Sequence, residues 1–484
     1  MKKFTILPLA LALILTSCGA EKLPDETTAG DTTTAAGESG ETTGLSAELP
    51  DADYGGYEFR VLIRPKTTVD WAGDMFRESS GDVLDDAVYN RNQAVEEKLG
   101  VKLVKVESSD ANYAGDGKNS ILAGDDAYDL IMPHTRTAFG YAEEGLCLDF
   151  NDLRYVDLDK PWWNADARES FTINDKLYVM TGDISFQLLG QSMCLFFNKT
   201  LLDRYNEEYP YQTVADMKWT LEEFGRLVAL CSDDLNGDGR MTDTDDLFGY
   251  STHQWRGPMQ ALVICGGRVA SKDKNGDIVL SLNTERVQKC FEDFFKIADS
   301  ANVNLQMNKE NAAKGDYFID VFRDGRALFL SANLNNASYM RSMKDDFGII
   351  PSPMYDESDG RYYTNVDGGL HLLIVPKTAS DPDRTSAVLE ALSAEGYSRV
   401  MPAYYEVALT TKYVRDELSV AMIDLIRDAR VLDLGYNNNG LTGRFASFGY
   451  FLADDPNHAF ASFYAKYESE VKTGMEKDLE SYGK

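Results

Sequence analysis

The chain has 484 residues, more than the roughly 100–200 residues of one ordinary domain, so we expect two or more lobes. Hydrophobic residues make up 43% and charged residues 26%, a balance typical of a protein that buries a large core. The 79 acidic residues outnumber the 48 lysines and arginines, and the net charge of -31 disfavours binding to nucleic acid or to anionic membrane surfaces. With only four histidines, a histidine-rich metal enzyme is also disfavoured.

Residues 1–18, MKKFTILPLALALILTSC, are typical of a secretory signal. Two lysines precede an apolar stretch from Phe4 to Leu15, which is shorter than the about 20 residues that span a bilayer. The end, Leu15-Thr16-Ser17-Cys18, resembles the bacterial lipobox, in which the cysteine is lipidated and becomes the mature N-terminus. We therefore expect lipidation at Cys18. The alternative is an ordinary signal peptide in which Cys18 has no special role.

Residues 19–50 are rich in Thr, Gly, Glu, Ala and Ser. Such a stretch lacks the apolar residues needed to offset the entropy of ordering, so we expect a disordered tether. A lipid followed by this tether would hold the folded part at the extracellular face of the cell membrane.

The folded part begins with elements that predict an α/β lobe. A strand is expected at Tyr57–Ile63 and another at Val101–Val106. Between them, the apolar residues from Leu84 to Leu99 recur on one helical face, and Gly100 fits the left-handed position after a helix. Strand, helix and strand in this order predict a parallel, right-handed crossover. A third strand is expected at Tyr128–Met132.

Further elements continue the α/β alternation. A hairpin is expected at Phe171–Met180 with its turn at Asn174-Asp175, and a helix should begin at Thr220, which has capping-box spacing to Glu223. The other expected strands are Met193–Asn198, Ala327–Leu330 and Leu370–Val375, and the other expected helices are 284–299, 384–395 and 415–430. The remaining cysteines, which are widely spaced and mostly in apolar surroundings, favour buried thiols, although one pair could bridge: Cys147, Cys194, Cys231, Cys265 and Cys290.

Short motifs along residues 55–430 resemble one family, the bacterial extracellular solute-binding proteins of ABC importers, of the kind that bind sugars. The matching segments, in the family's order, are Asn90-Arg91-Asn92, Val95-Glu96-Glu97-Lys98, Val101-Lys102-Leu103, Tyr128-Asp129-Leu130-Ile131, Leu148-Asp149-Phe150-Asn151-Asp152-Leu153, Asp175-Lys176-Leu177-Tyr178, Leu195-Phe196-Phe197-Asn198-Lys199, Trp219-Thr220-Leu221-Glu222-Glu223-Phe224 and Phe322-x-x-Gly325-x-Ala327. No single motif is specific, so their order carries the resemblance. The C-terminal stretch 431–484, rich in Asn, Gly, Phe and Tyr, departs from smaller members.

The resemblance implies a periplasmic-binding-protein-like fold with two α/β lobes and a ligand cleft between them. We expect lobe I to comprise 51–190 and 346–398, and lobe II to comprise 191–345 and 399–484. It also implies a monomer that closes about a hinge on a small solute, a carbohydrate, and delivers it to the permease subunits of an ABC importer.

The segment from Asp234 to Asp245 has the spacing of an EF-hand calcium loop. Oxygen ligands fall at Asp234, Asn236, Asp238 and Asp245, Gly239 stands at the sharp turn, and Arg240 would offer its backbone carbonyl. We expect a structural Ca²⁺ here, although Asp245 replaces the usual glutamate. The alternative is a solvated acidic turn. The similar segment Asp273–Asp277 lacks a twelfth-position acid and favours a hairpin turn.

Sugar recognition needs flat apolar faces together with planar polar side chains, placed in loops that follow strands. Packing or plain surface exposure is the alternative for every candidate. The candidates are Arg64, Trp71, His134, Thr135, Arg136, Asp183, Ser185, Trp255, Asn333, Asn335, Asn336, Asp367, Tyr404 and Tyr405. Trp162 and Trp163 follow Pro161 and favour a place in the core.

Enzymatic function is disfavoured, because the chain lacks Gly-x-Ser-x-Gly, the phosphate-binding Gly-x-x-x-x-Gly-Lys loop and His-Glu-x-x-His. We expect a binding protein without catalytic residues. A receptor for a peptide or a metal complex, a secreted glycosidase with paired carboxylates, and a surface adhesion module are the alternatives.

Overall fold

The computed structural model describes residues 46–65, 71–109, 115–307, 309–310, 314–410 and 417–482, with the side chains of 71–72, 407–410, 417 and 419 excluded. The predicted signal segment, Cys18 and the predicted tether up to residue 45 therefore lie outside the described residues. The last five tether residues, 46–50, are described, and Ala47 and Leu49 pack against the core. The folded part thus begins slightly before the predicted residue 51.

A parallel three-stranded sheet has the order β2-β1-β3, from β1 (Tyr57–Ile63), β2 (Val101–Glu107) and β3 (Leu130–Met132). Helix α1 (Val83–Leu99) joins β1 to β2 and buries the apolar face that includes Leu84, Val88, Val95 and Leu99. The helix ends at Gly100, whose φ of 62° is left-handed. The predicted strand-helix-strand order with parallel strands is confirmed.

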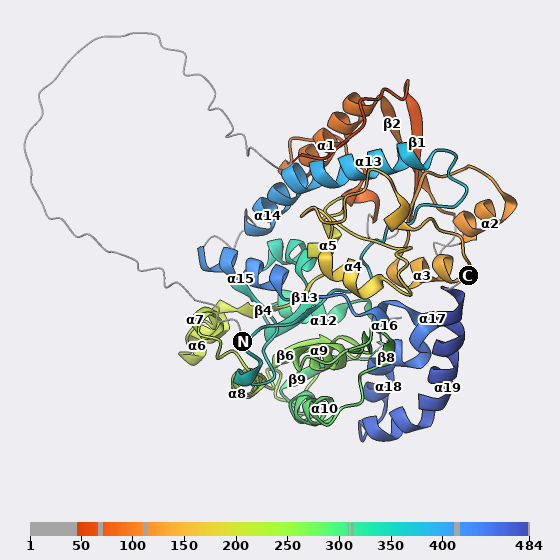
Figure 1. Ribbon diagram of the computed structural model, residues 1–484. Coiled ribbons are helices and arrows are strands. Elements are labelled where there is room, and N and C mark those ends of the chain that lie inside the picture. Colours follow the sequence, from red (N-terminus) through yellow and green to blue (C-terminus); the bar gives the residue numbers. More distant parts are fainter. Residues whose placement is uncertain are drawn as a thin grey trace, which may run out of the picture. The chain divides into compact units, whose positions relative to one another are not determined.

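Helices and turns surround this sheet, and α13 (Pro382–Glu395) lies along α1 (Figure 1). The others are η1 (Trp71–Asp74), α2 (Gly115–Ala123), α3 (Thr135–Glu143), η2 (Phe150–Asp152), α4 (Ala165–Phe171) and α5 (Gln187–Gly190). The predicted hairpin is shorter than expected, because Phe171 ends α4. Its turn is confirmed, since Asn174 and Asp175 have φ values of 49° and 61°.

The segment predicted as the strand Leu370–Val375 forms isolated bridges, not a continuous ladder. Ile374 bridges to Ile131 in β3, and Leu373 bridges to Met180. The segment Leu370–Val375 therefore lies beside the first sheet in an extended conformation but does not form a regular strand.

A second, mixed sheet has the order β11-β4-β10-β6-β5, with β9 also pairing with β6. Its strands are β4 (Met193–Asn198), β5 (Ser232–Asp233), β6 (Leu247–His253), β9 (Val303–Gln306), β10 (Ala327–Asn333) and β11 (Phe347–Ile350). Because β11 pairs with β4, the chain stays in this sheet up to Ile350. The boundary predicted at residue 346 therefore precedes the last strand of the second sheet.

Helices pack on both faces of the second sheet, which is the lower half of Figure 1. They are α6 (Lys199–Tyr205), α7 (Tyr211–Ala215), α8 (Leu221–Val228), α9 (Arg256–Ile264), α10 (Glu285–Ala298), α12 (Tyr317–Arg323) and η3 (Leu334–Ser342). As predicted, α8 begins after Thr220, whose side chain accepts the Glu223 N–H. The turn at Gly276, with a φ of 89°, joins β7 (Ala270–Lys272) and β8 (Ile278–Leu280) as a hairpin.

Short extended segments connect the two sheets. β12 (Thr364–Asn365) pairs with β13 (Arg430–Val431), and Val366 bridges to Ser192. Between β12 and β13 the chain forms α13, the π-helical turn η5 (Gly396–Val400), α14 (Met401–Thr410) and α15 (Glu417–Asp428). These segments are where a movement of one sheet relative to the other would be absorbed.

The C-terminal helices contact the cores of both sheets. They are α16 (Leu434–Asn437), α17 (Asn439–Thr442), η6 (Gly443–Ser447), α18 (Phe448–Asp454) and α19 (Phe460–Ser481). Met475 of α19 packs into the core around the first sheet, while Val471 packs into the core of the second. Residues Ser46–Lys484 consequently form one compact unit by their contacts.

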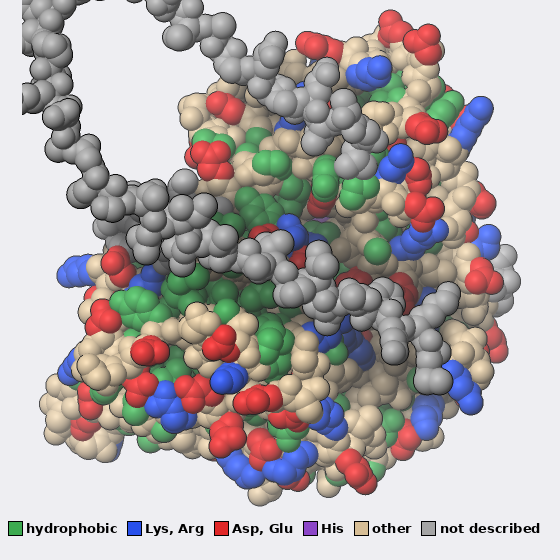
Figure 2. Space-filling model, turned by 60° about the vertical axis from the view of Figure 1, so that its left-hand side comes forward, with side chains coloured by type: hydrophobic (Ala, Val, Ile, Leu, Met, Phe, Trp, Pro, Cys, Tyr) green, Lys and Arg blue, Asp and Glu red, His purple; other side chains and the backbone are tan. Residues whose placement is uncertain are grey.

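Charged side chains cover much of the surface, while hydrophobic side chains gather in a band across the middle of the face in Figure 2. Among the described residues, no helix is both long enough and apolar enough to cross a membrane. The cysteines within the described residues are buried free thiols, as predicted: Cys147, Cys194, Cys231, Cys265 and Cys290.

Candidate ligand-binding site

A cavity of about 240 Å³ lies where elements of both sheets and the C-terminal helices meet. The loop after β3, the start of α9 after β6 and the connecting segment after β12 each supply part of its wall. Its lining residues are His134, Arg136, Trp255, Met259, Asp367, Gly368, Tyr436, Ala446, Ser447, Phe448, Gly449 and Tyr450. The cavity therefore follows the ends of strands, which is where ligands bind in open α/β sheets.

The first sheet contributes His134 and Arg136. Strand β3 ends at Met132, and His134 caps α3 by accepting the Arg136 N–H through Nδ1 at 3.2 Å. The Arg136 guanidinium donates to the carbonyl of Ala446 at 3.1 Å and lies 5.3 Å from the centre of the Tyr436 ring. Arg136 thus links the first sheet to the C-terminal segment.

His134 is held neutral at physiological pH. Burial and then the Arg64 guanidinium lower the pKa of His134 to about 3. Because Nδ1 already accepts the Arg136 N–H, the neutral ring carries its proton on Nε2 and has this N–H left to donate to a ligand hydroxyl.

The second sheet contributes Trp255, which follows β6. Its ring is nearly parallel to that of Tyr436, with 20° between the planes and 6.4 Å between the centres. The guanidinium of Arg256 lies 4.6 Å from the centre of the Trp255 ring and donates through Nη1 to Asn333 at 2.6 Å. Arg256 also pairs with Asp367 at 3.7 Å. The aromatic pair Trp255 and Tyr436 therefore lies beside a hydrogen-bonded polar network that is centred on Arg256.

Two glycines let the connecting segment approach the cavity closely. A Cβ at Gly368 would lie 2.9 Å from His134, and a Cβ at Gly369 would lie 3.1 Å from Gln191. The Gly369 N–H donates to Asp367 Oδ1 at 2.7 Å and fixes that carboxylate. A larger residue at either position would push neighbouring side chains aside.

Arg64 and Thr135 support this segment from behind and do not line the cavity. Arg64, which is buried, donates through Nη1 to the carbonyl of Gly369 at 3.0 Å. The Thr135 hydroxyl donates to the carbonyl of Gly368 at 3.3 Å. Arg64 and Thr135, both predicted as ligand residues, therefore hold the connecting segment in position.

Three other predicted ligand residues lie elsewhere. Asn335 and Tyr404 line a separate cavity beside α5, where the Tyr404 ring stacks on Phe186 at 4.8 Å. Asp183 lines another cavity. The backbone of Trp71 belongs to η1, but its side chain lies outside the described residues.

The sequence analysis missed the contribution of the C-terminal stretch. Tyr436 and the segment Ala446–Tyr450 supply half of the residues that line the cavity. This stretch is rich in aromatic residues and glycine. The run Ser447-Phe448-Gly449-Tyr450 is the signal that could have identified its contribution to the cavity. A Cβ at Gly449 would lie 3.0 Å from the backbone of Trp255, so the run packs closely on that strand end.

In the predicted calcium loop, carboxylate and amide oxygens accept hydrogen bonds from the loop's own backbone. Asp234 accepts from Gly237 and Gly239, Asn236 accepts from Asp238, and Asp238 accepts from Arg240. Asp245 instead accepts from the Thr244 hydroxyl. Within the described residues, no group of three or more His, Cys, Asp or Glu side chains is gathered as a metal site. Calcium binding by this loop stays a prediction.

Comparisons with known proteins agree on fold and family. The family described as bacterial extracellular solute-binding protein matches residues 91–397. The GacH receptor of Streptomyces glaucescens, solved unliganded and with acarbose, matches with a TM-score of 0.54 and 15% identity over 86% of this chain and 99% of that chain.

Two further structures give the same result. UspC of M. tuberculosis matches with a TM-score of 0.54 and 12% identity over 87% of this chain and 100% of that chain. The maltose/maltodextrin-binding domain MalE of Bdellovibrio bacteriovorus, bound to maltotriose, matches with a TM-score of 0.51 and 13% identity over 88% of this chain and 100% of that chain. No curated protein matches the chain in sequence.

These likenesses confirm the predicted α/β binding-protein fold. The family match also confirms that the protein binds a solute and is not an enzyme. Since the family match covers more than half of its residues, the chain belongs to the bacterial extracellular solute-binding proteins.

Proposed function

We propose that this protein is a lipid-anchored receptor that captures a carbohydrate, specifically an oligosaccharide, and delivers it to the permease of an ABC importer. Membership of the solute-binding family supports the receptor role. The signal-like residues 1–18 with Cys18, and the polar stretch behind them, support an anchor at the extracellular face of the cell membrane.

The cavity between the two sheets is the observation that carries the carbohydrate assignment. Trp255 and Tyr436 line the cavity with nearly parallel rings, and together they form an aromatic wall against which a sugar ring could pack. Asp367, the neutral His134 and the Arg136 guanidinium line the cavity and offer an acceptor and donors for hydroxyl groups, while Arg256 pairs with Asp367. Structures of similar fold that were solved with acarbose and with maltotriose also support a carbohydrate ligand.

The size of the cavity indicates how an oligosaccharide would sit. Its volume of about 240 Å³ is below the roughly 300 Å³ at which pockets for drug-sized ligands begin. We therefore expect the cavity to enclose one end of the glycan, with the remaining rings following the cleft between the sheets.

Hinge closure is the proposed mechanism. The ligand would contact the loop after β3 and the start of α9 together, and it would make both sets of contacts only when the two sheets approach each other. Binding energy then shifts the equilibrium from the open to the closed arrangement, which the permease recognises. No bond is made or broken.

A thermal-shift screen of the purified mature protein tests the proposal. The panel contains mono- and oligosaccharides, peptides and metal complexes, and each glycan is checked for hydrolysis by chromatography. We expect one glycan class to raise the Tm, because a ligand that binds only the folded state stabilises it. Stabilisation by peptides or metal complexes alone would replace the carbohydrate assignment, and turnover of any glycan would contradict the receptor.

A further inference from the structure

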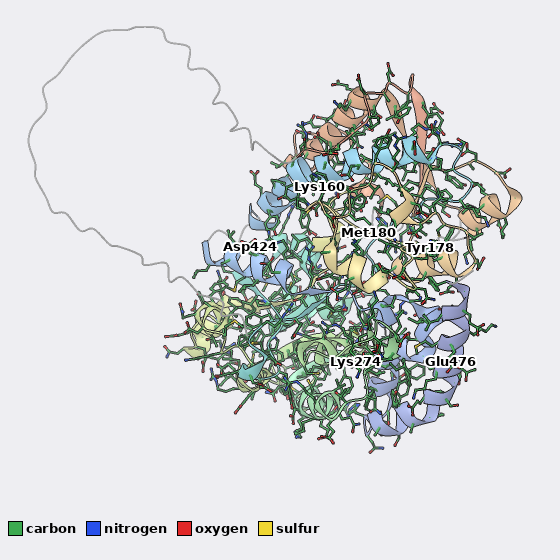
Figure 3. The ribbon with its side chains drawn as sticks, in the orientation of Figure 1. Lys160, Tyr178, Met180, Lys274, Asp424 and Glu476 are labelled. Atoms are coloured by element: carbon green, nitrogen blue, oxygen red, sulfur yellow. The ribbon has the colours of Figure 1, made fainter. Side chains whose placement is uncertain are left out.

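A second cavity, of about 630 Å³, shares no lining residue with the first. Its walls come from the segment before α4, the turn before α5, the π-helical turn η5 with α14, and the end of α15 with β13. Figure 3 labels Lys160, which lines this cavity, and Asp424, which lies on α15 and pairs with the lining residue Arg427.

Asp183 and Arg430, two oppositely charged groups in its walls, attract each other but form no ion pair within the described residues. Among the described residues, the carboxylate of Asp183 has no hydrogen bond or ion pair, although it lines the cavity. Arg430 donates through Nε to the carbonyl of Arg427 at 2.8 Å, but its Nη1 is buried without a hydrogen-bond partner in the described part of the chain. A buried charge without a partner costs free energy, which a ligand of opposite charge would recover.

The other cations in the cavity wall are already paired. Arg427 contacts Asp428 at 3.0 Å and donates through Nη1 to the Tyr405 hydroxyl at 3.0 Å. Lys160 pairs with Asp157 at 3.8 Å. Asp183 and Arg430 are therefore the groups that a ligand would satisfy first.

The electrostatics of the two groups agree with this geometry. Burial raises the pKa of Asp183 to about 7, although Arg430 and Arg427 oppose the shift. Burial likewise lowers the pKa of Arg430, and Asp183 opposes that shift. Desolvation thus disfavours the charge on each group, and the mutual attraction across the cavity offsets this cost only in part.

Aromatic and apolar side chains stand beside the charges. Tyr397 on η5 is 39% exposed, and its ring centre lies 6.5 Å from that of Trp162. Leu188 and Met401 complete an apolar wall. The lining of the cavity thus combines the Asp183 carboxylate, the Arg430 guanidinium and an aromatic surface.

We propose that this second cavity binds a small zwitterion of the amino-acid type, with its ammonium on Asp183, its carboxylate on Arg430 and an apolar or aromatic side chain against Tyr397. A zwitterion would form an ion pair with each of the two groups at once. A sugar acid would pair with Arg430 but offer Asp183 only neutral hydroxyls, and a simple amine would leave Arg430 unpaired.

The position of the cavity couples such a ligand to the connecting segments. Asp183 precedes α5 beside the first sheet, whereas Arg430 belongs to β13, which pairs with the connecting strand β12. The π-helical turn η5 packs directly on the Asp183 backbone, since a Cβ at Gly396 would lie 2.0 Å from its carbonyl oxygen. Single π-helical turns are frequent at functional sites.

Calorimetry on the purified mature protein tests the proposal after a thermal-shift screen of the twenty amino acids. With L-phenylalanine as the probe, the matched controls are L-phenylalaninamide, which lacks the carboxylate, and N-acetyl-L-phenylalanine, which lacks the ammonium. We expect both blocked forms to bind at least ten-fold more weakly than the free amino acid. If the screen selects another amino acid, its own amide and N-acetyl forms replace these controls.

Two variants assign the contacts. Asp183→Asn should remove the discrimination against the N-acetyl form, and Arg430→Gln should remove the discrimination against the amide. Tyr339→Ala, at a side chain that is 50% exposed and lines neither cavity, should leave amino-acid binding unchanged. The blocked ligands test the wild-type protein directly, so the proposal stays falsifiable even if a variant does not fold.

Three results would overturn the proposal. They are no stabilisation by any amino acid, equal affinity for blocked and free forms, and tighter binding of glucuronate that depends on Arg430. The last result would reassign the cavity to a sugar acid. None of them would bear on carbohydrate binding in the first cavity, which Trp255 tests separately.

Discussion

Trp255 and Tyr436 present nearly parallel rings to the first cavity, although 181 positions separate them along the chain, between residues 255 and 436. The sequence predicts Trp255 and Arg136 as ligand residues because each follows a strand, and Asp367 because it precedes Gly368-Gly369, where the backbone can approach a ligand closely. Tyr436 follows no long strand, and only the packing of the C-terminal helices brings it to the site. A residue whose role depends on that packing leaves no local pattern to find.

The Trp255 ring should contribute directly to glycan affinity. We expect Trp255→Ala to weaken binding of the glycan found in the screen by about ten-fold, equivalent to about 1.4 kcal/mol, because the stacking surface is removed. Isothermal titration calorimetry measures the change. Tyr339→Ala is the matched control, since Tyr339 is 50% exposed and does not line the cavity. Equal affinities for the wild type and Trp255→Ala would remove Trp255 from the site.

At the scale of elements, local sequence patterns predict the end of a helix correctly where a capping residue marks it. Gly100 ends α1 with a left-handed φ of 62°, and Thr220 caps α8. The prediction was less successful for Leu370–Val375, which forms only isolated bridges. An apolar run indicates burial, but the neighbouring chain decides whether a ladder forms.

Replacing Gly100 tests how tightly its helix end is packed. Both Gly100→Ala and Gly124→Ala place a side chain at positive φ, which costs roughly 1 kcal/mol. At Gly100 the new Cβ would also lie 1.8 Å from Asp53 Oδ1, whereas nothing lies within 4 Å at Gly124. We expect urea denaturation to show a loss larger by about 1–2 kcal/mol for Gly100→Ala. Equal losses would mean that Asp53 moves away freely.

The contact between α3 and α19 should make stability depend on pH. Burial, and then the nearby Asp478, raise the pKa of Glu143 to about 7, and burial raises the pKa of Asp478 to about 6. In the unfolded chain, the pKa of a carboxyl group is about 4. The folded state therefore binds more protons than the unfolded state between about pH 4 and 7, so the free energy of unfolding falls as the pH rises through this window, and the loss is complete above about pH 7.

Removing the Glu143 charge should help most at high pH. We expect Glu143→Gln to raise the Tm by about 1–3 °C at pH 8 and by less at pH 5. Asp478→Asn should follow the same pattern. Differential scanning calorimetry at the two pH values gives the comparison, and an equal gain at both would show that burial of the charges does not control this contact.

At the scale of the whole molecule, the C-terminal helices extend over the cores of both sheets. Val471 and Met475, one helical turn apart on α19, enter different cores. The segment from Tyr436 to Tyr450 then reaches the first cavity. A ligand there contacts both sheets and this segment at once, so closure should involve all three.

Glycan binding should make the protein more compact in solution. We expect small-angle X-ray scattering to show a lower radius of gyration when the glycan is saturating, and amide exchange to slow in residues 434–450, which contribute to the cavity wall. Trp255→Ala at the same glycan concentration is the control and should show smaller changes. An unchanged radius at saturation would contradict hinge closure.

The amino-acid sequence by itself determined the α/β class, most regular elements and the family resemblance, because these depend on apolar periodicity, caps and turn residues that act over a few positions. It also identified Arg136, Trp255 and Asp367 as cavity residues. Only the tertiary structure decided that Arg64 and Thr135 support the site, that Asp183 lines another cavity, and that the C-terminal helices supply Tyr436. The physical reason is that a cavity is bounded by surfaces from distant segments, and their meeting depends on the packing of the whole core.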